Sequence, residues 1–182
     1  MAHVFTTSYV KDATDLLNYY KRLGDRAMSQ APEAGLLASL DDESNSIAII
    51  VKHLSGNMVS RWTGFLTTDG EKPTRNRDSE FEDAPKTGKE VLERWEAGWK
   101  CVFDALAQLT DADLNRTVYI RTEPHSVMQA IQRQVGHYAY HVGQIVYLAK
   151  HFAGANWTAI TVPRRKSGEF NARVARGEAS QR

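Results

Sequence analysis

The chain has 182 residues and a formal net charge of +1, from 23 Lys and Arg against 22 Asp and Glu. The length suits one domain, which we expect over residues 1–182, and the nearly neutral charge argues against duplex DNA, RNA or an anionic membrane as a partner. The single cysteine, Cys101, excludes an internal disulfide and zinc sites built from several cysteines, so a metal site would need histidine or carboxylate ligands.

Two helices are expected in the first third of the chain. From Tyr9 to Gln30, apolar residues recur every three or four positions, which predicts an amphipathic helix that Pro32 ends. A second helix is predicted from just after Asp41 and Asp42 to Phe65, because acidic residues stabilise a helix N-terminus.

A long polar segment follows the second helix. Residues 67–84 have no helical or strand periodicity and form a predicted loop of roughly 18 residues. Such a loop is long enough to act as a lid over a site or to bind an anionic group, and its candidates for these roles are Arg75, Arg77, Asp78 and Glu80. The alternative is a solvated charged loop with no role in a site.

The second half of the chain predicts two further helices. Thr87 and Glu90 form a capping-box pattern for a third helix that runs to about residue 108. The fourth, from about Ser126 to Phe152, has apolar residues that alternate spacings of three and four, as in a bundle. Residues 117–120 between them have strand-like side chains, but no convincing second strand accompanies them.

These elements predict an all-α four-helix bundle whose core spans about residues 5–153. Residues 164–182 carry six basic and two acidic side chains, and we expect a solvated tail there. The N-terminus lacks the basic start and long apolar run of a signal peptide, and the longest aliphatic run, residues 47–51, is far short of a membrane span. We therefore expect a cytoplasmic protein with no membrane contact.

Three histidines have a spacing that suits a metal site. His137 and His141 lie one turn apart on one helix face, where two neutral imidazoles can bind one ion. His53 of the second helix is the candidate third ligand; the alternative is a hydrogen-bonded histidine at a helix interface. No Glu follows His137, which disfavours the metalloprotease pattern His-Glu-x-x-His. Asn57 and Gln144 share the ligand faces and are candidates for orienting the ligands or a substrate, with plain surface amides as the alternative.

Longer motifs around these residues carry a family resemblance. The segment His137-Tyr-Ala-Tyr-His141-Val-Gly-Gln144-Ile, with His53-Leu-Ser-Gly-Asn57 upstream, resembles the DinB/YfiT-like superfamily. A second set of segments resembles an uncharacterised domain-of-unknown-function subfamily within it: residues 60–73, Arg77-Asp78, Glu80-Phe81 and residues 119–126. The resemblance covers about residues 5–153.

The resemblance implies a bundle with up-down-down-up connectivity, often dimeric, that binds a divalent metal through three histidines. On this sequence those positions are His53, His137 and His141. Zn, Ni, Fe and Mn all accept imidazole, so the donor type does not choose among them. Arg121 is a further candidate to face the mouth of the site, although no spacing demands it.

Three histidines leave at least one coordination position open, which is the catalytic rather than the structural pattern. Members of the superfamily include thiol-dependent S-transferases and isomerases, and others are described as metal-dependent hydrolases. Our leading hypothesis is an enzyme in which the ion activates a low-molecular-weight thiol toward a small-molecule substrate. The alternatives are a hydrolase that activates water and a non-catalytic, metal-stabilised accessory protein. The resemblance, with four Trp and seven Tyr in a small domain, also predicts a homodimer.

Overall fold

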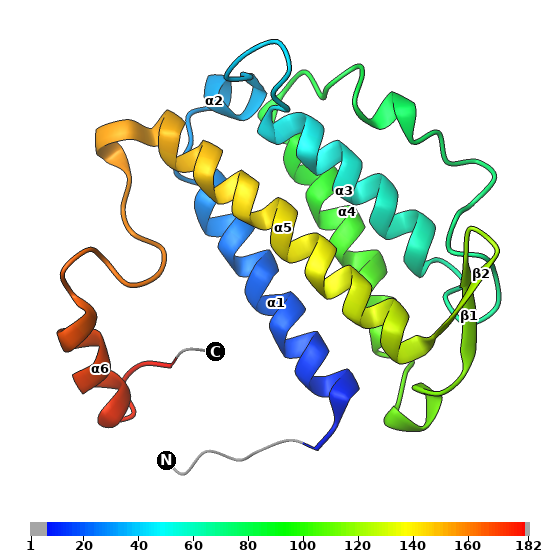
Figure 1. Cartoon of the computed structure of the whole chain (residues 1–182). Helices are drawn as coiled ribbons and strands as arrows, with labels where there is room; N and C mark the ends of the chain where they lie inside the picture. Colours follow the sequence, from blue (N-terminus) through cyan, green and yellow to red (C-terminus); the bar gives the residue numbers. More distant parts are fainter. Residues whose placement is uncertain (1–6, 181–182) are drawn as a thin grey trace.

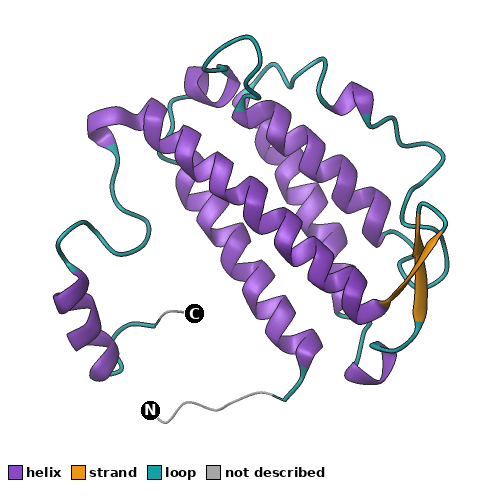
Figure 2. Ribbon diagram, viewed as in Figure 1, coloured by secondary structure: helices purple, strands orange, loops and turns teal. Residues whose placement is uncertain are grey.

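Four long helices form the body of the protein in the computed structural model, which describes residues 7–180 (Figure 1). They are α1 (Tyr9–Met28), α3 (Ile47–Trp62), α4 (Gly88–Leu106) and α5 (Val127–Ala153). Helices α1 and α5 run in one direction and α3 and α4 in the other, so the connectivity is up-down-down-up. The predicted all-α four-helix bundle is confirmed, and Figure 2 shows how little of the chain is in strands. Residues 5 and 6 of the predicted core, and the ends of the predicted domain, lie outside the described residues.

The parallel course of α3 and α4 explains the long loop between them. Because these helices pack side by side, the chain that leaves the end of α3 must travel back along the bundle before α4 begins. Residues 63–87 make this return and contain the short 3-10 helix Asp78–Glu80. The return carries Glu80 past the middle of α3 beside Gly56, where a Cβ atom would collide with the Glu80 carboxylate.

Side-chain caps determine where three of the helices begin. At the starts of α3, α4 and α5, a hydroxyl oxygen accepts a hydrogen bond from the backbone N–H three residues further on, and the capping residues are Ser46, Thr87 and Ser126. Helix α4 therefore begins where its capping-box pattern predicts. Helix α3 begins later than predicted because Ser46 caps it, while the Asp41 carboxylate accepts a hydrogen bond from the N–H of Ser44 within the preceding turn. It also ends at Trp62, before the predicted Phe65.

Large aromatic side chains fill the space between the four helices. Trp62, Trp95, Trp99 and Tyr138 are each at most 2% exposed. The Trp99 ring meets those of Trp95 and Tyr138 edge-on, with ring centroids 5.5 Å apart in both pairs. Since Trp99 is on α4 and Tyr138 on α5, this packing fixes α5 against the α3–α4 pair.

The structure differs from the prediction between α4 and α5, where a β-hairpin forms. Strand β1 (Thr117–Ile120) pairs antiparallel with β2 (Glu123–Ser126), so the expectation that residues 117–120 have no partner strand is wrong. The turn residues Arg121 and Thr122 have φ values of 56° and 64°, a left-handed conformation in which Gly or Asn is usual. The Asp69 carboxylate accepts hydrogen bonds from both of their backbone N–H groups and holds the turn.

Two further helices lie outside the sequence prediction. Helix α2 (Glu33–Leu37) directly follows Pro32, and α6 (Ser167–Ala175) lies in the segment expected to be a solvated tail, apart from the four-helix body (Figure 1). The chain before α6 returns to the bundle, because Ile160 is 6% exposed and its carbonyl oxygen accepts a hydrogen bond from Nη1 of Arg26 at 2.7 Å. From residue 164 on, the described tail is mostly exposed, as expected for a solvated segment, but it contains a helix that the sequence does not predict.

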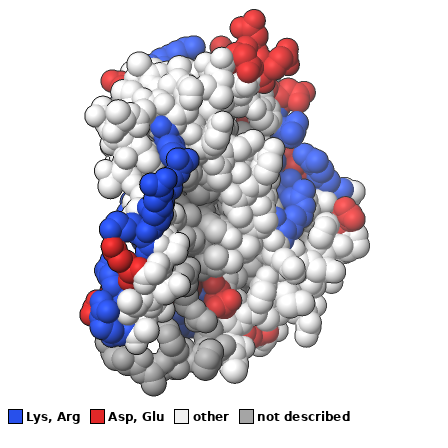
Figure 3. Space-filling model, turned by 60° about the vertical axis from the view of Figure 1, so that its left-hand side comes forward, with Lys and Arg blue, Asp and Glu red and all other residues white. Residues whose placement is uncertain are grey.

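Charged side chains are grouped on the surface. Figure 3 shows a band of Lys and Arg side chains along one side of the face it presents and an acidic group at its top, with a largely uncharged area between them. Further Lys and Arg side chains lie directly beside the acidic group, and acidic side chains interrupt the basic band. Within residues 7–180, no helix has the length and apolar character needed to cross a membrane.

Candidate metal centre

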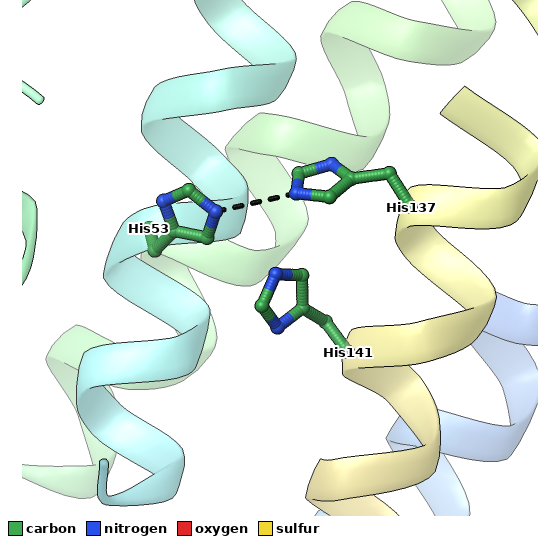
Figure 4. Close-up of side chains that lie close together, drawn as sticks. All are labelled: His53, His137 and His141. Carbon is green, nitrogen blue, oxygen red and sulfur yellow. Dashed lines mark hydrogen bonds between the residues drawn. The ribbon is translucent and has the colours of Figure 1, made fainter. Parts of the chain in front are cut away.

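The three histidines predicted as metal ligands lie together between α3 and α5 (Figure 4). His53 is on α3 and is 4% exposed, whereas His137 and His141, one turn apart on α5, are half-buried. One ring nitrogen of each residue lies within 4.8 Å of the other two. In Figure 4 a nitrogen of His141 is turned toward the gap between the other rings. The bundle thus brings together His53 and His137, which are 84 positions apart.

The spacing of the ring nitrogens suits a small divalent ion. Nε2 of His53 is 3.3 Å from Nε2 of His137, and two imidazole nitrogens bound to one tetrahedral ion at about 2.0–2.1 Å lie about 3.3 Å apart. The ring planes of the three residues are steeply inclined to one another, at pairwise angles of 66°, 84° and 88°, so the rings do not stack face to face. The residues present therefore fit a three-histidine metal site with at least one position left for substrate or solvent.

Oxygen acceptors hold the outer nitrogen of two of these histidines. Nδ1 of His53 lies 2.8 Å from Oε2 of Glu80, and both side chains are buried. Nδ1 of His141 lies 2.7 Å from Oε1 of Gln144. An oxygen at Nδ1 accepts a hydrogen bond from the ring N–H, which favours the proton on Nδ1 and leaves the Nε2 lone pair free, as is usual for a metal-binding histidine. Nδ1 of His137 is buried with no hydrogen-bond partner in the described part of the chain.

Glu80 is itself fixed by an arginine. Nε and Nη2 of Arg75 each donate to one oxygen of Glu80 at 2.8 Å, and neither side chain of this bidentate pair is more than 7% exposed. Burial raises the pKa of the Glu80 carboxyl group, but the hydrogen bonds from His53 and Arg75 outweigh it, so the pKa is lowered overall. Glu80 therefore presents a negative charge to the outer nitrogen of His53.

Burial keeps the two histidines of α5 neutral. The pKa of His137 is lowered to about 3, first by burial and then because a protonated His137 would be repelled electrostatically by His141, His53 and Arg133. Burial also lowers the pKa of His141, although its hydrogen bond with Gln144 acts in the opposite direction. Because neutral imidazole is the form that binds metal ions, both side chains are in the binding form at neutral pH.

Beside the histidines, a buried hydrogen-bond network joins α3 to α5. Nε2 of Gln134 donates to Oδ1 of Asn57 at 2.6 Å and to the hydroxyl oxygen of Tyr138 at 2.9 Å. The Tyr138 hydroxyl accepts from Nε1 of Trp62 at 2.9 Å and donates to Asn57 at 3.3 Å. Asn57, a candidate for orienting the ligands, therefore bonds to this network and holds the two ligand helices together, whereas the other candidate, Gln144, contacts a histidine directly.

The candidate residues of the loop occupy different places around His53. Phe81 packs against the His53 ring, with ring centroids 4.7 Å apart. Arg77 lies over Phe81, 5.1 Å from the ring centroid, and so meets the site through that ring. Asp78 begins the 3-10 helix that ends with Glu80. Of these loop candidates, Glu80 is the one that bonds to a histidine.

Arg121 contacts an acidic residue of the loop rather than the histidines. Its Nε donates to Oε2 of Glu71 at 3.0 Å, and Glu71 also pairs with Arg75. Arg121 is thus connected to His53 by a chain of ion pairs through Glu71, Arg75 and Glu80.

No sequence pattern identifies Glu80 as the partner of His53. Nothing local distinguishes it from the acidic residues that follow it, because its position depends on how the loop returns past α3. The one available signal is Gly56, three residues after His53, whose missing side chain lets the loop approach the helix.

Comparisons with known proteins agree with this architecture. Residues 4–166 match the family described as "Protein of unknown function (DUF1572)". The crystal structure of a DinB-like protein from Bacillus cereus ATCC 10987 superposes with a TM-score of 0.63 at 13% sequence identity, covering 85% of this chain and 99% of that one. At this identity the likeness shows the fold alone. No curated protein matches the sequence.

Proposed function

We propose that this chain, which belongs to the DUF1572 family of proteins of unknown function, binds a divalent metal ion through His53, His137 and His141 and uses the ion in catalysis. The observation that carries the proposal is the convergence of three imidazole nitrogens within 4.8 Å. Three protein ligands leave a coordination position free, as in catalytic metal sites. The donor set suits Zn, Ni, Fe or Mn.

The reaction we propose is the transfer of a low-molecular-weight thiol to an electrophilic small-molecule substrate. A divalent ion in this site would lower the pKa of the thiol and so supply a thiolate nucleophile. The sulfur forms a bond to the electrophilic carbon as the bond to the leaving group breaks, and the thiol proton passes to the leaving group or to solvent. What supports this choice is the resemblance of the segments around His53 and His141 to a superfamily that contains thiol-dependent S-transferases.

The side chains around the histidines have distinct tasks in this scheme. Glu80 and Gln144 hold the Nδ1 protons of His53 and His141, which keeps the opposite nitrogens available as ligands. Phe81 covers the His53 ring on the side of the loop. The buried network between α3 and α5 holds the two helices at the separation that the three ligands need.

Elemental analysis of gently purified protein tests the metal site. We expect a stoichiometric divalent ion in the wild type and its loss in His141→Ala. His125→Ala is the matched control, because His125 lies in β2 and its Nδ1 meets the backbone carbonyl of Glu123. If the wild type holds no ion even after metal is supplied, the proposal is wrong.

Incubating the metal-loaded protein with an electrophile, with and without a small thiol, tests the reaction. Turnover that requires the thiol supports the S-transferase. Turnover without it contradicts the S-transferase and favours the hydrolase, in which the same site activates water. If the wild type has no activity and His137→Ala only lowers the thermal stability, the ion belongs to a non-catalytic accessory protein.

We further propose a cytoplasmic homodimer with no nucleic-acid partner. The superfamily resemblance supports the dimer, as do two exposed aromatic residues of α5, Tyr140 at 63% and Tyr147 at 70% exposure. The nearly neutral charge supports the absence of nucleic acid. Light scattering after size-exclusion chromatography tests the dimer, and salt-sensitive retention of DNA or RNA in filter binding would contradict the last point.

A further inference from the structure

A cavity with several cationic side chains in its lining lies beside the loop that returns from α3 to α4. It has a volume of about 380 Å³, is open to solvent and is lined by α3, α4 and loop residues between 72 and 80. Its lining includes small residues of both helices, such as Gly56 and Gly98, and none of the three clustered histidines. Pockets for small molecules are typically about 300–1,000 Å³, so this cavity is large enough for a small ligand.

Positive charge dominates the lining of this cavity. Lys52 of α3, Lys72 and Arg75 of the loop and Arg94 of α4 accompany a single carboxylate, that of Glu80. Glu80 already forms its bidentate pair with Arg75. Three cations in the lining therefore have no acidic partner within it.

Two of these three cations have hydrogen-bonding capacity to spare. The Lys52 ammonium group donates to two backbone carbonyls of the loop and so anchors it. The Lys72 ammonium group, with three N–H donors, meets the backbone carbonyl of Asp69. The side chain of Arg94 has neither a hydrogen bond nor an ion pair among residues 7–180.

The surroundings of Lys72 also favour an anion. The pKa of its ammonium group is lowered by burial and by the charge of Arg61, although Asp69 and Glu71 act in the opposite direction. The charged form is therefore less favourable there than in water, and an anion in the cavity would offset that cost.

We propose that this cavity binds a small phosphate-bearing ligand, which Arg94 contacts from α4 and Lys72 from the loop. A guanidinium group can donate two parallel hydrogen bonds to phosphate oxygens, and an ammonium group adds a compact charge. Thr74 and Asn76 in the lining add neutral donors. Cations on two walls suit a phosphate, which carries up to two negative charges, better than a carboxylate. The site is separate from the histidines and does not require a metal ion.

Isothermal titration of the full-length protein with inorganic phosphate at millimolar concentrations tests the site. We expect saturable binding that Arg94→Gln and Lys72→Gln each weaken by about tenfold, the loss typical of one charge-assisted hydrogen bond. Lys89→Gln is the matched control, because Lys89 is also on α4, is 83% exposed and lies outside the lining. Arg94 is exposed as well, so its substitution leaves the core intact and the test stands even if Lys72→Gln does not fold.

The same titration on His141→Ala protein separates this cavity from the metal centre. We expect phosphate binding to persist in that variant; its loss would place the phosphate at the histidines and overturn the proposal. Acetate is the second probe, and binding as tight as that of phosphate would overturn the assignment to a phosphate. If Lys89→Gln weakened phosphate binding equally, or if the wild type showed no saturable binding, the proposed site would be wrong.

Discussion

Glu80 and His53 are 27 residues apart in the chain, yet Oε2 of Glu80 lies 2.8 Å from Nδ1 of His53 in the protein interior. The contact forms because the return from α3 to α4 passes beside Gly56 and because Arg75 holds both carboxylate oxygens. A carboxylate at the outer nitrogen of a histidine fixes the tautomer and the direction of the ring. The loop between α3 and α4 therefore helps to orient one of the proposed ligands.

We expect Glu80→Gln to weaken divalent-metal binding by about 10–100-fold, the usual cost of losing a carboxylate behind a histidine ligand. Glutamine keeps the size of the side chain and removes the charge that holds the Nδ1 proton of His53. Competition with a chromophoric chelator measures the affinity. Glu71→Gln is the matched control, because Glu71 also pairs with Arg75 but, in the described structure, bonds to no histidine. Equal weakening in both variants would contradict a specific role for Glu80.

The hydroxyl group of Tyr138 is expected to stabilise the joint between α3 and α5. Tyr138→Phe removes the group that meets Gln134, Asn57 and Trp62, and leaves buried polar atoms without a partner. We expect the free energy of unfolding to fall by about 1–3 kcal/mol in chemical denaturation. Tyr140→Phe, at a residue that is 63% exposed, should change it by less than about 0.5 kcal/mol. Similar losses in both variants would mean that the network adds nothing of its own.

The four long helices are predictable from the sequence because their signals act locally. The apolar period of each helix determines which face is buried, and the Thr87 cap marks the start of α4. The same periodicity places His53 on one helix face and His137 and His141 on another, and the bundle brings these faces together. The sequence therefore predicts the helix faces, and with them the three candidate ligands.

The remaining features depend on contacts between distant segments, which no local pattern contains. The hairpin turn at Arg121 and Thr122 lacks the usual Gly or Asn because Asp69, 52 and 53 residues upstream, holds it. Asn57 lies on the predicted face of α3, but its partners come from α5, where Gln134 and Tyr138 reach it. Periodicity gives the face on which a side chain lies and does not give the group that it meets.

Thr122 offers a test of backbone strain in the hairpin. Its φ of 64° is unfavourable for a β-branched residue and acceptable for glycine. We expect Thr122→Gly to raise the free energy of unfolding by about 0.5–1 kcal/mol. Thr117→Gly, at the start of β1, should lower it, because glycine is disfavoured in strands and costs more conformational entropy on folding. A decrease for Thr122→Gly in the same denaturation experiment would show that the Thr122 side chain stabilises the turn more than the backbone strains it.

Burial of His137 should link the stability of the metal-free protein to pH. The pKa is about 3 in the folded protein against an ordinary value of 6.5, so between these values the unfolded chain binds a proton that the folded protein does not. The contribution of His137 to the free energy of unfolding is therefore fully present above about pH 6.5 and is lost as the pH drops from 6.5 toward 3. The lowered pKa of His141 acts in the same direction. The lowered pKa of Glu80 affects stability only below its ordinary pKa of 4.5. A loss of stability between pH 6.5 and 4.5 therefore reports the two histidines of α5.

Denaturant unfolding of chelator-treated protein at a series of pH values measures this dependence. His137→Gln should reduce the loss of stability between pH 6.5 and 4.5, because glutamine takes up no proton in either state. The loss of stability below pH 4.5, which comes from Glu80, should not change. His151→Gln is the control, since His151 is an exposed histidine near the end of the same helix, and it should leave the profile unchanged. If His137→Gln keeps the full loss above pH 4.5, burial does not hold His137 in its neutral form. The readiness of this side chain to bind a metal at neutral pH would then need another cause.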